Sequence, residues 1–217
     1  MHKQQVPSII LLTLLVIAVP AAAYAAILVG VKNGDWIEYR VTITGAVPPD
    51  HNATWAKMEV TQVQGNTISL NITTGFLDAM SLQEQIVLNL ETGSLGDDFI
   101  IPANLKTDDT FFDSRQGNIT IAGTKQVTVA GAERTIIYAS TIETNYCWDQ
   151  VTGVLVEAHT SLASYNMTTN ADKTNMWQPQ QREVDPVILY ALVIAVAVIA
   201  VSAIVLFLRR KKHGASV

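Results

Sequence analysis

The amino-acid sequence predicts a mainly β protein, with an antiparallel, strongly curved sheet or sandwich as its outer domain, a transmembrane helix near its carboxy-terminal end and a signal or anchor helix at its amino-terminal end. Three observations predict this class. Apolar and polar residues alternate with a period of two through most of the chain from Trp36 onward. Two long uncharged segments flank that region, and all 19 acidic residues lie between Asp35 and Asp185.

The amino-terminal segment, residues 1–30, is predicted to be a signal peptide or signal anchor. Lys3 gives a positive start, an apolar stretch of signal-peptide length follows from Ile9, and Ala23 to Ala25 has the small-x-small form of a cleavage site. Cleavage after Ala25 is the interpretation we favour. An uncleaved helix is the alternative, because the apolar run continues to Val31.

A transmembrane helix is predicted over residues 187–208. This run of 22 uncharged residues spans roughly 33 Å as a helix, which is enough to cross the hydrocarbon core of a bilayer. Asp185 is a candidate N-cap, and Pro186 suits the first helical turn because its missing N–H costs nothing there. Residues 178–186 before the helix are expected to form a short stalk.

The orientation of this helix follows from the basic cluster that comes after it. Positive flanks stay on the cytoplasmic side during insertion, so residues 209–217 are expected to form a short basic cytoplasmic tail. The topology anchors are Arg209, Arg210, Lys211 and Lys212. The expected location is the plasma membrane, as a single-pass type I protein with residues 31–185 extracytoplasmic and the lipid bilayer as its first partner.

The middle of the chain, residues 31–177, is predicted to be one extracytoplasmic β domain. Alternating runs start at Trp36, and the turn at Gly65 and Asn66 joins two of them into a hairpin. Further alternating runs occupy residues 82–90, 119–129, 134–143 and 154–161, and one short helix is expected within residues 76–85. The region from residue 31 to residue 185 has 19 acidic residues and a net charge of −10, so it would repel a polyanion, and no nucleic-acid partner is expected.

The sharpest predicted turn connects Trp148 to Val154. Asp149 is expected to accept a backbone hydrogen bond within the turn, and Gly153 to adopt a positive φ. These two residues are therefore interpreted as structural, and a catalytic role for Asp149 is the weaker alternative.

Two short segments of the outer domain are alike. Residues 31–37 and 105–111 share the order apolar residue, Lys, two small or polar residues, Asp and an extended aromatic segment. A shared turn-to-strand solution is the interpretation we favour, and a duplication is the alternative.

Four short segments together carry a resemblance to known proteins. They are residues 34–39, which fit the pattern GDW(I/V)xY, residues 101–105 and 131–134, and residues 147–155, which contain a WDxxTGVL hairpin. This set resembles a group of uncharacterised archaeal membrane-anchored surface proteins. The resemblance implies a β-rich outer domain, a carboxy-terminal membrane helix and an archaeal cell surface, and it implies no catalytic residue.

Glycosylation is expected on the outer domain. Four Asn-x-Thr sequons occur in the predicted outer region, at Asn52, Asn71, Asn118 and Asn166. Asn71 falls on the polar face of its predicted strand, from which a sugar can point to solvent.

No constellation for catalysis or cofactor binding is evident in the sequence. It has no phosphate-binding glycine loop, zinc spacing, nucleophile elbow or HExxH helix. Cys147 is expected to be a small buried hydrophobe, with a pairing to His159 as the weaker alternative. An acidic group in the loops is expected to be a solvated edge without metal: Asp97, Asp98, Asp108, Asp109 and Asp113. Tryptophans at strand ends are expected to close the core, with stacking on sugars as the alternative: Trp36, Trp55 and Trp148. Trp177 differs, because it precedes the stalk and is expected to pack at the stalk base or to rest at the lipid headgroups.

These observations predict a non-enzymatic surface protein without catalytic residues, cofactors or metal. Its outer domain is expected to act in binding, adhesion or envelope and complex assembly, with a membrane or envelope protein as partner. The alternative is a carrier or sensor of an apolar, lipid-like ligand enclosed by the curved sheet.

Overall fold

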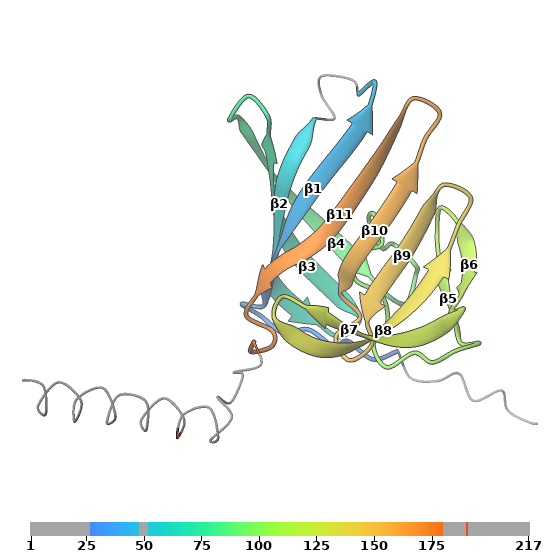
Figure 1. Ribbon diagram of the computed structural model, residues 1–217. Coiled ribbons are helices and arrows are strands. Elements are labelled where there is room, and N and C mark those ends of the chain that lie inside the picture. Colours follow the sequence, from blue (N-terminus) through green and yellow to red (C-terminus); the bar gives the residue numbers. More distant parts are fainter. Residues whose placement is uncertain (1–26, 48–51, 180–189, 191–217) are drawn as a thin grey trace, which may run out of the picture.

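The folded domain is built on one large antiparallel sheet that curves into a cup (Figure 1). The computed structural model describes residues 27–47, 52–179 and Tyr190. Nine strands form the sheet in the order β4-β3-β2-β1-β11-β10-β9-β8-β7, and β5 pairs with β6 in a second, two-stranded sheet. The strands are β1 (Trp36–Gly45), β2 (Ala53–Gln64), β3 (Thr67–Phe76), β4 (Ser81–Asn89), β5 (Thr110–Asp113), β6 (Gly117–Thr120), β7 (Gly123–Val129), β8 (Ala132–Ser140), β9 (Thr144–Asp149), β10 (Leu155–Ser161) and β11 (Tyr165–Thr174).

This architecture confirms the mainly β, antiparallel class, and the period-two pattern explains it. On β1 the side chains of Ile37 and Tyr39 lie on one face and are buried. The side chain of Arg40 lies on the opposite face and is exposed. Ile37 lies opposite Met58 of β2, and both point to the concave face. Because alternate side chains of a strand share a face, the apolar half of each strand fills the cup.

The first and last strands of the sheet pair with each other. β1 and β11 run antiparallel from Ile37 opposite Thr174 to Gly45 opposite Tyr165. The start of β1 and the end of β11 therefore lie at the same end of the sheet, which we call the closed end (Figure 1). At the opposite, open end lie the connections β1–β2, β3–β4, β8–β9 and β10–β11.

The segment between β4 and β7 packs into the closed end. Ile100 forms a bridge with Val154, and the indole Nε1 of Trp148 donates to the carbonyl of Asp98 at 2.7 Å. Phe111 of β5 meets Trp148 edge to face at 5.7 Å between ring centroids. These contacts join the small sheet to the large one around a buried tryptophan.

The two similar segments of the sequence form the same turn. The Lys32 N–H donates to Asp35 Oδ2 at 2.9 Å, and the Lys106 N–H donates to Asp109 Oδ2 at 2.7 Å. In return, the backbone N–H of each aspartate donates to the carbonyl of its lysine, at 3.1 and 3.0 Å. The shared turn-to-strand interpretation agrees with this geometry.

The residues before the two aspartates also share a backbone conformation. Gly34 has a φ of +83° and Asp108 a φ of +71°, so both lie in the left-handed region. Their N–H groups donate to Val60 and Ile121 carbonyls at 2.8 and 2.9 Å. The likeness ends with the strands that follow, since β1 has 10 residues and β5 has 4.

One expectation about secondary structure needs correction. Residues 76–85 contain no helix: β3 ends at Phe76, and after a turn β4 starts at Ser81. Residues 27–30 lie against the folded domain, where Ile27 and Val29 pack on the core and the Leu28 carbonyl accepts from the Ala103 N–H at 2.8 Å. These residues thus pack with the domain that follows them.

The tryptophans also differ from expectation. Trp148 and Trp177 are buried, whereas Trp36 is half-buried and Trp55 is 42% exposed. Trp55 lies over Gly75 on the outer face, where any side chain at position 75 would collide with the indole.

Several expectations fall outside the described residues. These are the segment before residue 27, most of the stalk, the helix over 187–208 apart from Tyr190, and the basic tail with Arg209 to Lys212. Among the residues that the structure describes, we find no helix with the length and apolar character needed to span a membrane.

Candidate functional site

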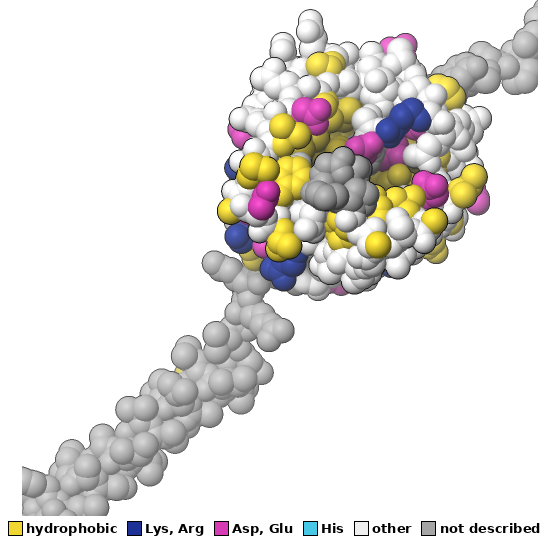
Figure 2. All heavy atoms as spheres, turned by 90° about the horizontal axis from the view of Figure 1, so that it is seen from above, with side chains coloured by type: hydrophobic (Ala, Val, Ile, Leu, Met, Phe, Trp, Pro, Cys, Tyr) yellow, Lys and Arg dark blue, Asp and Glu magenta, His cyan; other side chains and the backbone are white. Residues whose placement is uncertain are grey.

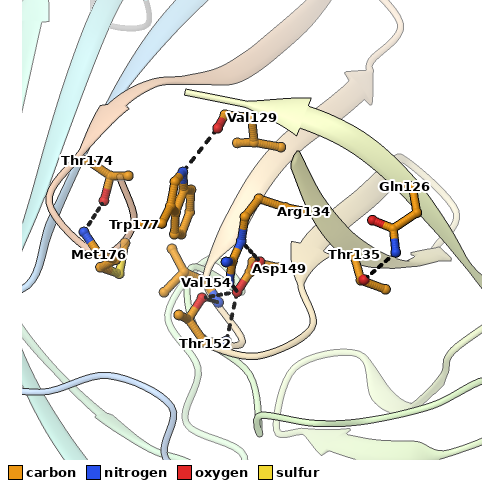
Figure 3. A network of polar contacts seen from close by, with 10 residues as sticks. All are labelled: Gln126, Val129, Arg134, Thr135, Asp149, Thr152, Val154, Thr174, Met176 and Trp177. Carbon is orange, nitrogen blue, oxygen red and sulfur yellow. Dashed lines mark hydrogen bonds and ion pairs between the residues drawn. The ribbon is translucent and has the colours of Figure 1, made fainter. Parts of the chain in front are cut away.

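A polar lock holds the closed end together (Figure 3). The Thr152 N–H and hydroxyl both donate to Asp149 Oδ1 at 2.8 Å, and the Gly153 N–H donates to the Asp149 carbonyl at 2.8 Å. Gly153 has a φ of +71°, and a Cβ there would collide with the Ile101 carbonyl. The β9–β10 turn therefore requires both the carboxylate and the glycine.

Arg134 of β8 completes this lock. Its Nε and Nη2 donate to the two oxygens of Asp149 at 2.7 and 3.0 Å, and Asp149 is fully buried. The guanidinium lies 4.8 Å from the centroid of the Trp177 ring, whose Nε1 donates to the Val129 carbonyl at 3.0 Å. Trp177, just beyond β11, is thus fixed to the β7–β8 turn, and the exit of the chain from the domain is fixed with it.

A polar groove of about 760 Å³ separates the β5–β6 hairpin from the β8–β9 turn. Its walls carry hydroxyl, amide and charged side chains, among them Asn118, Thr141, Glu143 and Tyr146. Arg115 on one wall forms an ion pair with Asp97 at 2.8 Å. The groove suits a polar ligand better than an apolar one.

Two carboxyl groups are buried beneath this groove. Asp98 and Asp113 have no exposed surface, and Asp98 Oδ1 and Asp113 Oδ2 have no hydrogen-bond partner among the described residues. Burial raises the pKa of Asp98 to about 6, with a further increase from the Asp113 carboxylate and smaller decreases from Arg115 and the Tyr146 hydroxyl. Asp98 therefore keeps its proton to a higher pH than an ordinary aspartate, and this proton removes the repulsion between the two carboxylates.

This finding corrects the interpretation of the acidic group as a solvated edge. Asp97, Asp108 and Asp109 are exposed as expected, but Asp98 and Asp113 are not. Within residues 27–47 and 52–179, no group of three or more His, Cys, Asp or Glu side chains is arranged to hold a metal ion.

Cys147 lies on the outer face of the sheet, in a shallow pocket of about 410 Å³ with Lys125, Glu157 and His159. Burial raises the pKa of its thiol, and this increase exceeds the decrease caused by Lys125. The His159 ring bonds to Glu157 Oε1 at 2.6 Å and to the Thr168 hydroxyl at 3.0 Å. The thiol is thus a protonated, buried group beside an imidazole that is engaged elsewhere, which is the opposite of an activated nucleophile.

The four sequon asparagines differ in accessibility. Asn118, on the wall of the polar groove, and Asn166, at the open end of β11, are exposed. Asn52 is half-buried, and Asn71 is half-buried with its Oδ1 enclosed and without a partner. Asn118 and Asn166 are therefore the sites that a sugar reaches most easily.

The open end of the cup carries uncovered apolar side chains. Leu77 and Met80, in the β3–β4 turn, are 72% and 65% exposed, and Leu82 follows on β4. We call these three residues the rim patch. Figure 2 looks into the open end and shows hydrophobic side chains within the opening, with both acidic and basic ones around it. Val41 and Ile43, on the concave face of β1, are only half-buried there.

Sequence reasoning missed the carboxyl pair and the rim patch. The pair joins residues 98 and 113 only because Gln116 Nε2 donates to Asp98 Oδ2 at 2.7 Å and its N–H to Asp113 Oδ1 at 2.6 Å. No spacing in the sequence signals this folding back of the loop. The rim patch had a signal, since Leu77, Met80 and Leu82 are large apolar residues within six positions, but the segment 76–85 was interpreted as containing a short helix.

Comparisons with known proteins give little more. No family model and no curated protein matches the chain. One solved structure, described as the siderocalin Ex-FABP that functions through dual ligand specificities, is similar with 9% sequence identity and a TM-score of 0.24, over 73% of this chain and 80% of that chain. A TM-score this low is below that of a shared fold, so the proposals below rest on this chain's own residues.

Replacing Arg134 by Met leaves the buried Asp149 carboxylate without its counter-ion. We expect a loss of about 3–5 kcal/mol in the free energy of unfolding, measured by urea denaturation with tryptophan fluorescence. Arg40→Met is the matched control, because Arg40 and Asp172 form an exposed pair at 3.0 Å worth at most about 1 kcal/mol. Equal effects of the two variants would contradict the lock.

Replacing Asp98 by Asn imitates the protonated acid. Because the pKa of Asp98 is raised above its value in the unfolded chain, its contribution to stability is present below about pH 4 and lost as the pH rises through about 6. Asp98→Asn should therefore match the parent at pH 4 and be more stable by about 2 kcal/mol at pH 8. Asn also suits the φ of +57° at this position.

Thermal unfolding between pH 4 and 8 measures this difference. Asp97→Asn is the control, since the Asp97 side chain is 76% exposed and should leave the pH dependence nearly unchanged. A parent protein that gains stability from pH 4 to 8 relative to Asp98→Asn would reverse the expected sign and refute the assignment.

Proposed function

We propose that the chain is a single-pass type I plasma-membrane protein whose outer domain binds a membrane or envelope partner without catalysis. The pairing of β1 with β11 carries the proposal, because it brings both the start and the end of the domain to the closed end. A domain held at its closed end directs its open end, with the rim patch, away from the bilayer. We also propose that the chain is related to the archaeal membrane-anchored surface proteins that it resembles.

The packing of residues 27–29 supports cleavage of the signal peptide after Ala25. Ile27 and Val29 pack on the core, so these residues serve the domain rather than a membrane helix. On this proposal, the helix over 187–208 is the anchor, and Arg209 to Lys212 hold its basic end in the cytoplasm.

The rim patch supports binding of a protein at the open end. Three exposed large apolar side chains within six residues are costly in water, and exposed apolar groups of this kind often mark interaction sites. The net negative charge of the chain, −5, favours a partner with basic groups around an apolar centre.

A second function, carriage of an apolar ligand in the cup, is favoured by a different observation. Val41, Ile43 and Met167 lie on the concave face near the open end and are only half-buried. A lipid-like chain that covers them would gain about 25 cal/mol for each Å² of apolar surface removed from water. The polar groove under the β8–β9 turn does not contribute to such a site.

The proposed sidedness is tested with single cysteines and a membrane-impermeant maleimide on intact cells. Thr42→Cys, on the exposed face of β1, should react, whereas Ser216→Cys in the tail should react only after permeabilisation. The native Cys147 is buried and supplies the background in both variants. Labelling of Ser216→Cys alone on intact cells would refute the proposed orientation.

Binding at the rim is tested by crosslinking on intact cells. The double variant Leu77→Ser, Met80→Ser should lower the yield of crosslinked neighbours about tenfold, since each lost apolar contact costs on the order of 1 kcal/mol. Val151→Ser, at an exposed apolar residue of the closed end, is the control and should leave the yield unchanged. Unchanged crosslinking in the double variant would exclude the rim.

Native mass spectrometry of the purified full chain separates the second function from the first. A bound lipid that disappears in Ile43→Glu would favour the carrier. A lipid-free parent protein would leave the binding module as the function.

A further inference from the structure

β4 forms an outer edge of the large sheet and offers its backbone to solvent. On the outer side of β4, Asn89 and Ser94 exchange two hydrogen bonds, Asn89 N–H to the Ser94 carbonyl at 2.8 Å and Ser94 N–H to the Asn89 carbonyl at 3.1 Å. Because every second residue of a strand presents its N–H and C=O to the same side, those of Gln83, Gln85 and Val87 also point outward. Among the described residues, no backbone group bonds to them on that side.

This edge has one inward-facing charge, Glu84, and lacks the other devices that normally prevent pairing. β4 has no proline and no lysine, and its register with β3 runs from Thr67 opposite Asn89 to Gly75 opposite Ser81 without a bulge. Leu82 and Val87 on this strand are 56% and 61% exposed. The other edge, β7, carries Lys125 in its middle, which is a common protection of an edge strand.

We propose that β4 pairs with β4 of a second copy of this chain, as a two-fold symmetric, antiparallel extension of the sheet. Symmetry dictates the direction. In a two-fold pair the same outward groups meet on both strands, and only the antiparallel ladder lets each residue both donate to and accept from its opposite.

The register follows from charge and from the backbone. With Gln85 on the axis, Gln83 lies opposite Val87 of the second copy, and all outward N–H and C=O groups of these residues are paired. A shift that centres the axis on Glu84 places two carboxylates opposite each other, which is unfavourable. The opposite shift, centred on Ile86, needs the outward groups of Asn89, which Ser94 already occupies.

This register also covers the apolar side chains that the edge exposes. Val87 comes to lie beside Gln83 of the second copy on the outer face. Leu82 lies opposite Leu88 of the second copy on the concave face, next to Ile86. The contact thus covers Val87, which the proposed function leaves unexplained, and Leu82, which also belongs to the rim patch.

On the proposed function, in which each domain is anchored at its closed end, the pairing also determines how two copies face each other. β4 runs from the open end to the closed end, so an antiparallel partner has its closed end pointing the opposite way. Two copies anchored at their closed ends then belong to two membranes that face each other. The edge is therefore suited to adhesion between like surfaces.

Disulfide trapping of the full chain in detergent tests the pairing. In Gln85→Cys the two Cα atoms across the axis lie about 5.5 Å apart, within the range of a disulfide. In Gln83→Cys, the matched control on the same face and strand, they are four residues apart along the strands, about 14 Å. We expect at least tenfold more covalent dimer from Gln85→Cys, with Cys147 present in both. Equal yields, or no dimer from Gln85→Cys, would overturn the pairing.

A proline supplies the complementary test. Gln85→Pro removes an outward N–H that the domain itself does not use, so dimers seen by analytical ultracentrifugation should disappear, while Gln85→Ala retains them. Melting temperatures of both variants show whether the domain is folded. Dimers that persist in folded Gln85→Pro, or a crosslink from Gln85→Cys to a different protein only, would refute self-pairing.

Vesicles separate this inference from the proposed anchoring. Vesicles that carry the full chain should cluster with one another, and Gln85→Pro should abolish the clustering. Covalent dimers without clustering would leave the β4 pairing in place and overturn the contact between facing membranes. Loss of the pairing, by contrast, leaves the impermeant-maleimide result, and with it the proposed sidedness, untouched.

Discussion

The pairing of the first strand of the sheet with the last is the constraint on which the rest of the molecule depends. β1 lies between β2 and β11, so the chain enters and leaves the sheet side by side at its closed end. This arrangement sets the direction of every other strand, and hence the end at which each turn lies. It also determines which part of the surface a membrane anchor would hold and which part it would present.

The closed end is built to keep that arrangement rigid. A fully buried carboxylate, a guanidinium and an indole connect the β9–β10 turn, β8 and the segment after β11. Buried charges persist only when each is paired, so the lock couples three elements that are distant in the sequence. The open end lacks a comparable device, and its apolar side chains remain available to a partner. On the proposed function, stability and binding are thus concentrated at opposite ends of one sheet.

Much of the fold was predictable because its signal is local. The alternation of Ile37, Tyr39 and their neighbours reports a strand whatever the strand pairs with, and the turn at Asp149 and Gly153 follows from the chemistry of those two residues. The curvature into a cup and the strand order depend on contacts between remote segments, which no single sequence window contains. The supposed helix over 76–85 failed because a turn flanked by apolar residues imitates a short amphipathic stretch.

The candidate sites were less predictable for the same reason. Asp98 and Asp113 look like ordinary loop aspartates until Gln116 and Trp148 fold over them. Likewise, an exposed edge strand is defined by the absence of a neighbour, and β4 has the same residue pattern as a strand inside the sheet.

The direction of the cup relative to the membrane is the central claim, and its most direct test is the distance of each end from the bilayer. Spin labels attached through Val151→Cys at the closed end and Leu77→Cys at the open end of the full chain in bilayers report this distance through relaxation by paramagnetic headgroup lipids. The account predicts strong relaxation at position 151 and little at position 77. Equal relaxation at both, or the reverse order, would contradict it.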